Sequence, residues 1–451
     1  MKALNFLNKY NRQALSIAII ALLLRLLFIL VIDTSPDYSG GDTNWYMQYG
    51  RALVTTGTTA GPVQTPPLYL VFVGSIQAIV PSHPDSGEYY IYTEMQIARV
   101  LQAIMSAGLC LFVYSIARSL FSERAGLLAA GFLAVSPALV IESGLLLSET
   151  LFLFFLFGGF ALYTHLQGQL TPWSAASVGF ILGLATLTRA VFLLFPCGLV
   201  VHLLLVQRER WLRLSSALVV SYCALVSTWT IYNLVEWDRF IIAGEGLMSF
   251  LHQGAEGKAS PREADIALDI SPEDDAEDRV NAIKTKLKDT ITNDPLGWVG
   301  HRVEELTSAY LQPHNTVYFR SESIKDNVED WWQDDRSPGG LIDITHSEAF
   351  WPKLALYGFH FAGLILGGVG MVLARREWRM LLPYYGLVLY FTGIHLILLA
   401  LPRYLFPMVP VWWIFATFAL MHIWRWQHDK RQATVDDPPG TTTPALHKMQ
   451  E

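Results

Sequence analysis

Residues 14–32 read ALSIAIIALLLRLLFILVI, an apolar run of 19 residues that contains one charged side chain, Arg25. A helix needs about 20 apolar residues to cross the hydrocarbon core of a bilayer. Lys2, Lys9 and Arg12 precede the run, which is too long for the apolar core of a signal peptide and has no small-residue cleavage site. The sequence therefore predicts a retained membrane-spanning helix near the N-terminus.

Similar apolar runs recur through the 451-residue chain. Hydrophobic residues make up 52% of it and charged residues 16%, whereas a soluble protein has about 25% charged residues. This composition excludes a soluble enzyme or a disordered protein and argues against nucleic-acid binding. We expect an all-α polytopic membrane protein with about ten spanning helices, at 14–32, 95–117, 125–141, 145–165, 173–188, 190–206, 214–232, 353–374, 381–400 and 404–424. The apolar segment 66–80 is short and begins with two prolines, which predicts a re-entrant or interfacial helix.

Charge is distributed unevenly along the chain. The net charge is −7, but residues 233–350 hold 24 acidic and 11 basic residues, so the remainder is basic. The basic side chains gather in alternate short loops and near the N-terminus. Those of the loops are Arg118, Arg124, Arg208, Arg210, Arg213, Arg375, Arg376, Arg379, Arg425, Lys430 and Arg431. Because basic loops stay in the cytoplasm, both termini are expected there, and 33–94 and 233–352 on the exterior face of the cell membrane.

These features predict four parts of the chain. An N-terminal transmembrane module at 1–232 contains the first exterior loop (33–94), and an acidic exterior segment follows at 233–352. The last spanning helices lie at 353–424, before a disordered cytoplasmic tail at 425–451. In the acidic segment we expect a polar loop at 256–280, helix at 282–312 with a break at 293–295, and a Trp pair at 331–332 that rests on the membrane or on the bundle.

Asp42 is the first candidate site residue. It follows the first predicted span by about ten residues, in Ser39-Gly40-Gly41-Asp42-Thr43-Asn44-Trp45-Tyr46. A carboxylate held at the membrane surface can act as a general base or bind a divalent cation. The alternative is structural, because Asp is a favoured N-cap and a helix is predicted at 45–53.

Other charged residues lie inside or beside the predicted spans. Glu149 is near the exterior end of the fourth span, where a charge is costly, so it should face the bundle interior or a polar cavity. A structural ion pair and a role in a site both explain it. Glu142 is closer to a turn and is expected to be solvated. Arg25 and Arg99 are expected to pair with internal carboxylates.

Two arginines occupy exterior-side turns that are otherwise apolar. They are Arg189, in Thr188-Arg189-Ala190-Val191, and Arg403, in Leu401-Pro402-Arg403-Tyr404. The planar guanidinium group suits phosphate oxygens, which makes a phosphate partner a reasonable interpretation. The alternative for each is a side chain that extends to lipid headgroups.

Taken together, these residues resemble the GT-C membrane glycosyltransferases, in particular the protein O-mannosyltransferases and lipid A aminoarabinose transferases of glycosyltransferase family 39 and its bacterial relatives. The resemblance covers about 15–235 and 353–412 and depends on the order of several short motifs. The motifs are GDTNWY at 41–46, PPLY at 66–69, ARVLQA at 98–103, SET at 148–150, GLATLTR at 183–189 and RYLFP at 403–407.

The resemblance implies a function. Relatives transfer a sugar from a polyprenyl-phosphate donor to an acceptor outside the cytoplasm, with inversion at the anomeric carbon. It implies Asp42 as the catalytic aspartate, as base or as ligand of Mg²⁺ or Mn²⁺, and Glu149 as a second acidic residue of the site. Arg189, Arg403 and Tyr404 would then bind the donor phosphate. The partners implied are a polyprenyl-linked sugar, a glycan, lipid or protein acceptor, and the bilayer, with no nucleic acid.

Two other classes of function remain open at this stage. A secondary transporter would explain ten spans and charges within them, but not an acidic segment of more than 100 residues. A non-catalytic subunit that binds polyprenyl lipid would use the same residues without turnover. Release of polyprenyl phosphate from a labelled donor separates the enzyme from both.

Overall fold

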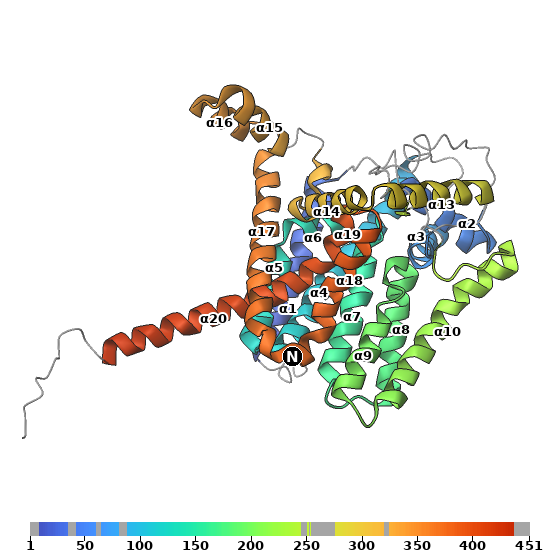
Figure 1. The fold of residues 1–451 in the computed structure, drawn as a ribbon, viewed down its shortest axis with the longest axis horizontal. Coiled ribbons are helices and arrows are strands. Elements are labelled where there is room, and N and C mark those ends of the chain that lie inside the picture. The colour runs from blue at the N-terminus through green and yellow to red at the C-terminus, as the bar shows by residue number, and fades with distance from the viewer. Residues whose placement is uncertain are drawn as a thin grey trace, which may run out of the picture.

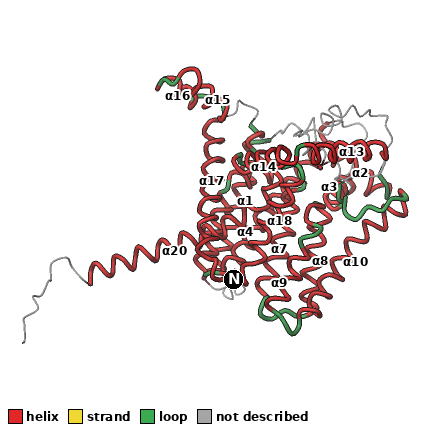
Figure 2. Tube along the Cα trace, in the orientation of Figure 1, coloured by secondary structure: helices red, strands yellow, loops and turns green. Residues whose placement is uncertain are grey.

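The computed structural model describes residues 9–34, 42–59, 65–80, 88–244, 250–251, 253, 276–319 and 324–436. Within these ranges every regular element is a helix (Figure 2). Most helices are roughly parallel and form one bundle, whereas α13 and α14 lie across one of its ends (Figure 1). The all-α fold class predicted from the apolar runs is therefore confirmed.

The N-terminal half of the bundle begins with α1 (Lys9–Leu27) and its continuation η2 (Phe28–Ile32). The buried face of α1 is formed by Ala14, Ala18 and Ala21, which are at most 7% exposed. Small side chains at this spacing let helices approach closely in a membrane protein. The helices packed against α1 are α4 (Glu88–Leu120) and α5 (Glu123–Val135), and α7 (Glu149–Leu166) packs in turn on α4.

Three further helices continue the bundle. They are α8 (Pro172–Thr188), α9 (Pro196–Val206), which follows the short turn η3 (Ala190–Phe192), and α10 (Trp211–Trp237). Thr171 and Ser174 form a capping box at the start of α8, which satisfies backbone donors that the first turn would leave free. Along most of its length α8 packs against α7 and α10.

The C-terminal helices close the bundle. They are α17 (Phe350–Leu373), η6 (Ala374–Glu377), α18 (Trp378–Ile397), α19 (Pro402–Leu405), η7 (Phe406–Met408) and α20 (Val409–Asp436). On α17 the buried residues Gly363, Gly367 and Gly370 face α20. A Cβ on Gly370 would come within 1.9 Å of the carbonyl oxygen of Phe415, so glycine is required for this approach.

Helices occupy all ten predicted spans, but the number of crossings stays a prediction. In the part of the chain that the structure describes, six helical stretches can cross a membrane by length and composition: Lys9–Ile32, Thr93–Leu120, Glu149–Leu166, Trp211–Trp237, Phe350–Ile397 and Pro402–His428. Counting α5 and α6 (Pro137–Gly144), bent by 54° at their junction, as one span makes seven. The helices α8 and Ala190–Val206 are shorter, as is α3 (Leu68–Ile79), the predicted interfacial helix.

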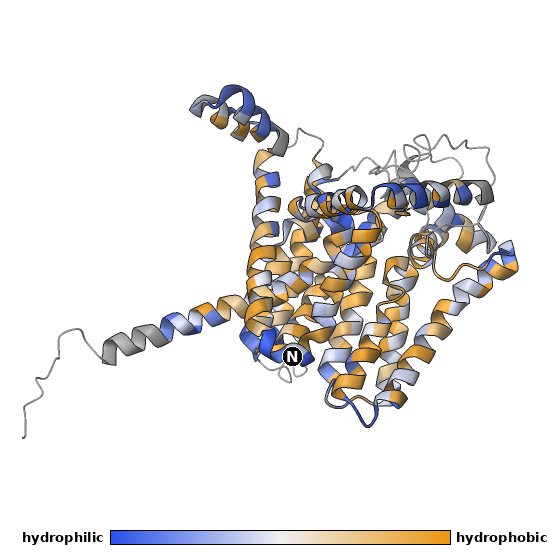
Figure 3. Cartoon of the chain, viewed as in Figure 1, coloured by the Kyte–Doolittle hydropathy of each residue, from blue (hydrophilic) through white to orange (hydrophobic). Residues whose placement is uncertain are grey.

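Hydrophilic residues gather at both ends of the bundle, and hydrophobic residues lie along its middle (Figure 3). The basic turns meet at the end that carries the N-terminus: Arg118 donates to Asn11, and Arg124 lies over the ring of Trp424. At the other end lie α13 (Ala276–Asn293) and α14 (Pro295–Leu311) of the acidic segment. The break between these two helices falls where it was predicted, because Asp294 caps α14 and Pro295 occupies its first turn.

Two predictions concern the chain outside the bundle: the tail at 425–451 and the polar loop at 256–280. The tail was expected to be disordered from 425, but α20 continues to Asp436. The run 425–436 contains no glycine or proline, so nothing in it stops the helix, and residues beyond 436 lie outside the described ranges. Of the predicted polar loop at 256–280, only the start of α13 at 276–280 is described.

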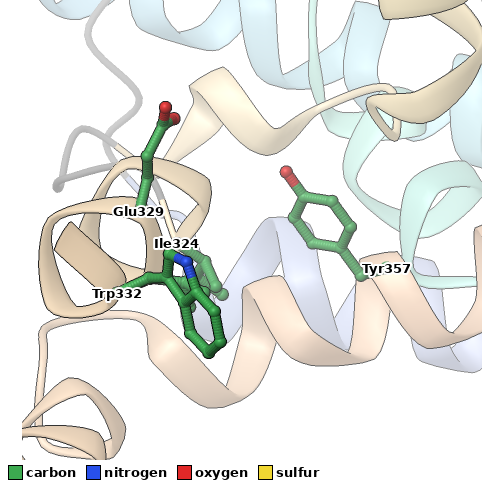
Figure 4. A pocket seen from close by; sticks show the side chains of 5 residues that line it. Ile324, Glu329, Trp332 and Tyr357 are labelled. Carbon is green, nitrogen blue, oxygen red and sulfur yellow. The ribbon is translucent and has the colours of Figure 1, made fainter. Parts of the chain in front are cut away.

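The Trp pair lies in a short helical hairpin made of α15 (Ile324–Asp330), η5 (Trp331–Asp335) and α16 (Pro338–Thr345). Trp331 donates to the carbonyl oxygen of Ser337, whereas Trp332 faces Tyr357 of α17 across an apolar groove of about 420 Å³ (Figure 4). Helix α15, which lines this groove together with Tyr357 of α17, lies away from α2 and α3 (Figure 1).

Candidate functional site

The charged residues singled out in the sequence meet at the bundle end that carries α14. Arg403 joins them: its Nη1 is 2.8 Å from Oδ2 of Asp42, and its Nε is 3.0 Å from Oε1 of Glu149. The same oxygen of Glu149 is 2.5 Å from Nη1 of Arg189. Two carboxylates and two guanidinium groups therefore form one continuous ion-pair network, which we call the charge cluster.

Asp42 is placed by α2 (Asp42–Thr56), whose first residue it is. This helix packs on α3 so closely that a Cβ on Gly74 would lie 2.0 Å from the carbonyl oxygen of Gly50. At its start, the hydroxyl of Thr43 donates to the carbonyl oxygen of Leu146 at 3.4 Å. The Asp42 side chain keeps half of its surface exposed, so it can meet a substrate from outside.

Glu149 is the first residue of α7 and is fully buried. The turn before it is fixed by Gln102 of α4, which donates to the carbonyl oxygens of Ser143 and Leu145 and accepts from the hydroxyl of Tyr69. A helix N-terminus favours negative charge, which supports an ionised carboxylate at this position. Its second oxygen, Oε2, has no hydrogen-bond donor among the described residues.

Arg189 and Tyr404 complete the charge cluster. Arg189 ends α8 in extended backbone geometry, and its Nη1 also donates to the hydroxyl of Ser148 at 3.4 Å. The ring of Tyr404 lies 5.6 Å from the guanidinium carbon of Arg189 and 5.7 Å from that of Arg403, within the range of cation–π contacts. His395 stacks on the same ring at 5.3 Å and holds it in place.

A second tyrosine, Tyr46, lies under the charge cluster and is only 7% exposed. Burial, together with the negative charges of Glu149 and Asp42, raises the pKa of Tyr46 to about 12. Its hydroxyl therefore stays protonated at physiological pH and cannot serve as a general base.

Sequence reasoning missed one group beside the charge cluster. Glu142 was expected to be solvated, but it is 1% exposed, and its Oε2 lies 2.7 Å from Nε2 of His314 and 3.2 Å from Nδ2 of Asn315. The ring of His314 also packs on Phe406, three residues after Arg403. His314 belongs to the acidic segment, and no motif marked it, because its partner is 172 residues away in the chain.

The two arginines inside the predicted spans behave differently. Arg99 pairs with Asp33 at 2.8 Å, as expected. The expectation for Arg25 was wrong: it is fully buried and donates to the hydroxyl of Ser106 and to the carbonyl oxygens of Ala21, Leu133 and Ala134. The bend between α5 and α6 frees such carbonyl groups, so Arg25 needs no carboxylate.

The charge cluster offers few oxygens to a divalent cation. Among the described residues no three His, Cys, Asp or Glu side chains gather as a set of ligands. Asp42 and Glu149 each face a guanidinium group at 2.5–3.0 Å, which competes with a cation for the same oxygens. This donor set does not fit Mg²⁺ or Mn²⁺, and the chemistry below uses only the side chains.

Solved membrane enzymes share the fold. The oligosaccharyltransferase of Archaeoglobus fulgidus matches 97% of this chain with a TM-score of 0.54 at 15% identity. A second structure of it, in complex with an inhibitory peptide and a dolichol-phosphate, matches 98% at 14% identity and the same TM-score. ArnT from Cupriavidus metallidurans bound to undecaprenyl phosphate matches 94% with a TM-score of 0.50 at 15% identity. The chain spans about half the length of the oligosaccharyltransferase (53%) and 62% of ArnT.

These matches show the fold, which is the GT-C membrane fold that the resemblance implied. Residues 91–232 match the family model for dolichyl-phosphate-mannose-protein mannosyltransferases. This range includes Glu149 and Arg189 but not Asp42 or Arg403. No curated protein matches the chain in sequence.

Proposed function

We propose that the protein is an inverting glycosyltransferase that moves a sugar from a polyprenyl-phosphate donor to an acceptor on the exterior face of the membrane. The observation that carries the proposal is the position of Arg403 between Asp42 and Glu149, at 2.8 and 3.0 Å. Arg403 thus lies beside the half-exposed carboxylate of Asp42 and is held in place by the buried carboxylate of Glu149. The fold and the family match support a transferase of this class.

The first step is donor binding. Arg403 keeps 28% of its side-chain surface exposed and Arg189 keeps 12%, so both can reach a ligand from the site while Glu149 anchors them from below. A guanidinium group binds phosphate oxygens in bidentate fashion. The donor phosphate then competes with Asp42 for Arg403, and its arrival releases the Asp42 carboxylate. The ring of Tyr404, 5.6 Å from the guanidinium carbon of Arg189 and 5.7 Å from that of Arg403, limits the directions in which the two guanidinium groups can turn.

The second step is transfer. The freed Asp42 carboxylate takes the proton from the acceptor hydroxyl while that oxygen bonds to the anomeric carbon. On the opposite face of the sugar the bond between the anomeric carbon and the phosphate oxygen breaks, and polyprenyl phosphate leaves with the electron pair. Arg189 and Arg403 stabilise the negative charge that develops on the departing phosphate. A single displacement of this kind inverts the anomeric centre.

We further propose which end of the bundle faces the cytoplasm and how the chain divides into domains. The basic turns at one end of the bundle favour a cytoplasmic location for that end, with both termini, and an exterior location for the charge cluster. The protein would thus be an integral inner-membrane protein with a catalytic module at 1–232, an acidic exterior segment at 233–352 and C-terminal spans at 353–424. The acceptor would be a glycolipid, polysaccharide or protein of the cell envelope.

The test is release of lipid phosphate. Purified protein is incubated with a labelled polyprenyl-phosphate sugar and an acceptor extract, and polyprenyl phosphate and labelled product are quantified. Wild type and an Arg375→Ala control, altered at the opposite end of the bundle, should both turn over, whereas Arg403→Ala should fall at least a hundredfold. Retention of intact donor by wild type would indicate a binding subunit, and neither binding nor release would favour a transporter; both results overturn the proposal.

A further inference from the structure

Helix α14 contacts the chain just before Arg403. α18 ends at Ile397, and the link 398–401 leads to α19, where Arg403 is the second residue. Leu398, Leu399 and Ala400 of this link are at most 7% exposed. Because only three peptide units separate Ala400 from Arg403, the position of the link limits where the Arg403 guanidinium group can lie.

Two charged side chains of α14 hold this link. Arg302 is 1% exposed and donates through Nε to the carbonyl oxygen of Leu396 at 3.1 Å and through Nη2 to those of His395 and Leu398. These are carbonyl groups that the last turn of a helix leaves without intrahelical partners. A buried cation at a helix C-terminus is also favoured by the helix dipole.

Glu305, one turn further along α14, completes the contact. Its Oε2 pairs with Nη1 of Arg302, and its Oε1 accepts from the backbone N–H of Ala400 at 2.7 Å. One carboxylate therefore neutralises the buried arginine and fixes the link itself. The next turn adds a hydrogen bond of 2.6 Å between the hydroxyl groups of Tyr310 and of Thr392 in α18.

We propose that Arg302 and Glu305 are positioning residues for Arg403. By fixing the end of α18 and the link, they hold the Arg403 guanidinium group at hydrogen-bond distance from both Asp42 and Glu149. Helix α14 of the acidic segment thus acts on the reaction through Arg403. The kinetic part of this inference rests on the proposed function. A displacement of about 1 Å of a catalytic group can lower the rate a hundredfold, so loss of the contact between Glu305 and the link should lower turnover.

The variants are Glu305→Ala, Glu305→Gln and the control Glu304→Ala, which removes an exposed carboxylate from the neighbouring position of the same helix. Turnover of Glu305→Ala should fall about ten- to a hundredfold with acceptor KM changed less than about threefold. Glu305→Gln retains an acceptor for the Ala400 N–H and should recover part of the loss. Glu304→Ala should match wild type. If Glu305→Ala fails to fold, the turnover and KM of Glu305→Gln are compared with those of wild type and Glu304→Ala instead.

A double-mutant cycle separates positioning from mere support of the fold. In an Arg403→Ala background, Glu305→Ala should cause no further loss of activity, because the group it positions is gone. An equal loss in both backgrounds would overturn the proposal. Hydrogen exchange of residues 398–406 provides a readout that needs no turnover: exchange should be faster in Glu305→Ala than in wild type or Glu304→Ala, and unchanged exchange would also overturn it. A wild type without transferase activity but with this exchange pattern would refute only the proposed function.

Discussion

The Nε of Arg403 lies 3.0 Å from Oε1 of Glu149, although 254 residues separate the two in the chain. Glu149 is fully buried, and Arg189 pairs with the same oxygen at 2.5 Å. Two positive charges therefore share one buried carboxylate, and Arg403 has a remaining nitrogen for Asp42. Glu149 is therefore the buried centre of the charge cluster, and Asp42 is its half-exposed carboxylate. Substitutions of the two residues should have different effects.

Asp42→Asn should separate chemistry from structure. Asn caps a helix about as well as Asp, and the lost ion pair with Arg403 is half-exposed and worth at most about 1 kcal/mol. Thermal stability should stay near wild type, and donor binding should be as strong or stronger because the phosphate no longer competes with Asp42 for Arg403, whereas turnover should fall about a hundredfold or more in a transfer assay. The exposed Asp289→Asn serves as the control. Undiminished transfer by Asp42→Asn would remove Asp42 from the mechanism.

Glu149→Gln should affect folding as well as turnover. Removal of one partner from a buried ion pair leaves an uncompensated charge and costs about 3–5 kcal/mol, and here two arginines lose the same partner. The unfolding midpoint in detergent should fall clearly, and turnover should drop at least a hundredfold. Glu149→Asp, which keeps the charge, should recover more stability than Gln. Equal stability of Gln and wild type would show that the pair contributes nothing to the fold.

Tyr46→Phe tests the assignment of the base through pH. In the folded protein the pKa of Tyr46 is about 12, above its ordinary value of 10.0. The folded state therefore binds this proton more tightly than the unfolded state. Its contribution to the free energy of unfolding is fully present below pH 10 and is lost as pH rises to 12. Wild type should therefore lose more stability than Tyr46→Phe between pH 10 and 12, as measured by chemical unfolding. The shape of the activity profile from pH 6 to 9 should be the same in both, because the hydroxyl does not titrate there.

Chelation tests the fit of a metal to the charge cluster. Because guanidinium groups pair with Oδ2 of Asp42 and Oε1 of Glu149 and compete with a cation there, EDTA should leave transfer within about twofold of the untreated enzyme. The assay is run with and without added Mg²⁺ or Mn²⁺ after extensive dialysis against the chelator. A loss that either ion restores would contradict this expectation and would assign Asp42 as a ligand.

Topology is tested by labelling of single cysteines in intact cells. In a background without Cys110, Cys197 and Cys223, cysteines replace the exposed residues Thr55 in α2 and Ser308 in α14, or Glu209 between α9 and α10. An impermeant thiol reagent should label the first two and not the third, because the basic turns favour the cytoplasm. Opposite labelling at 55 and 308 would be incompatible with a site shared by α2, α14 and α19.

The sequence alone specified most of the helices. Apolar length located the long helices of the bundle, and Asn293-Asp294-Pro295 located the break between α13 and α14, because both signals are local and depend on a few neighbouring residues. The tail was the clearest exception: helix formers continue α20 to Asp436, where composition had suggested disorder. Motif order also selected Asp42, Glu149, Arg189, Arg403 and Tyr404, all of which meet in one place.

The partners of those residues were decided only by the tertiary structure. The sequence could not tell that Arg403 bridges two carboxylates, that Arg25 binds carbonyl groups, or that His314 and Glu305 of the acidic segment reach the bundle. A hydrogen bond depends on ångström distances, and the positions of these groups are set by how helices cross and bend, not by their own residues. Hydropathy records which residues avoid water, whereas packing determines which charges meet once water is removed.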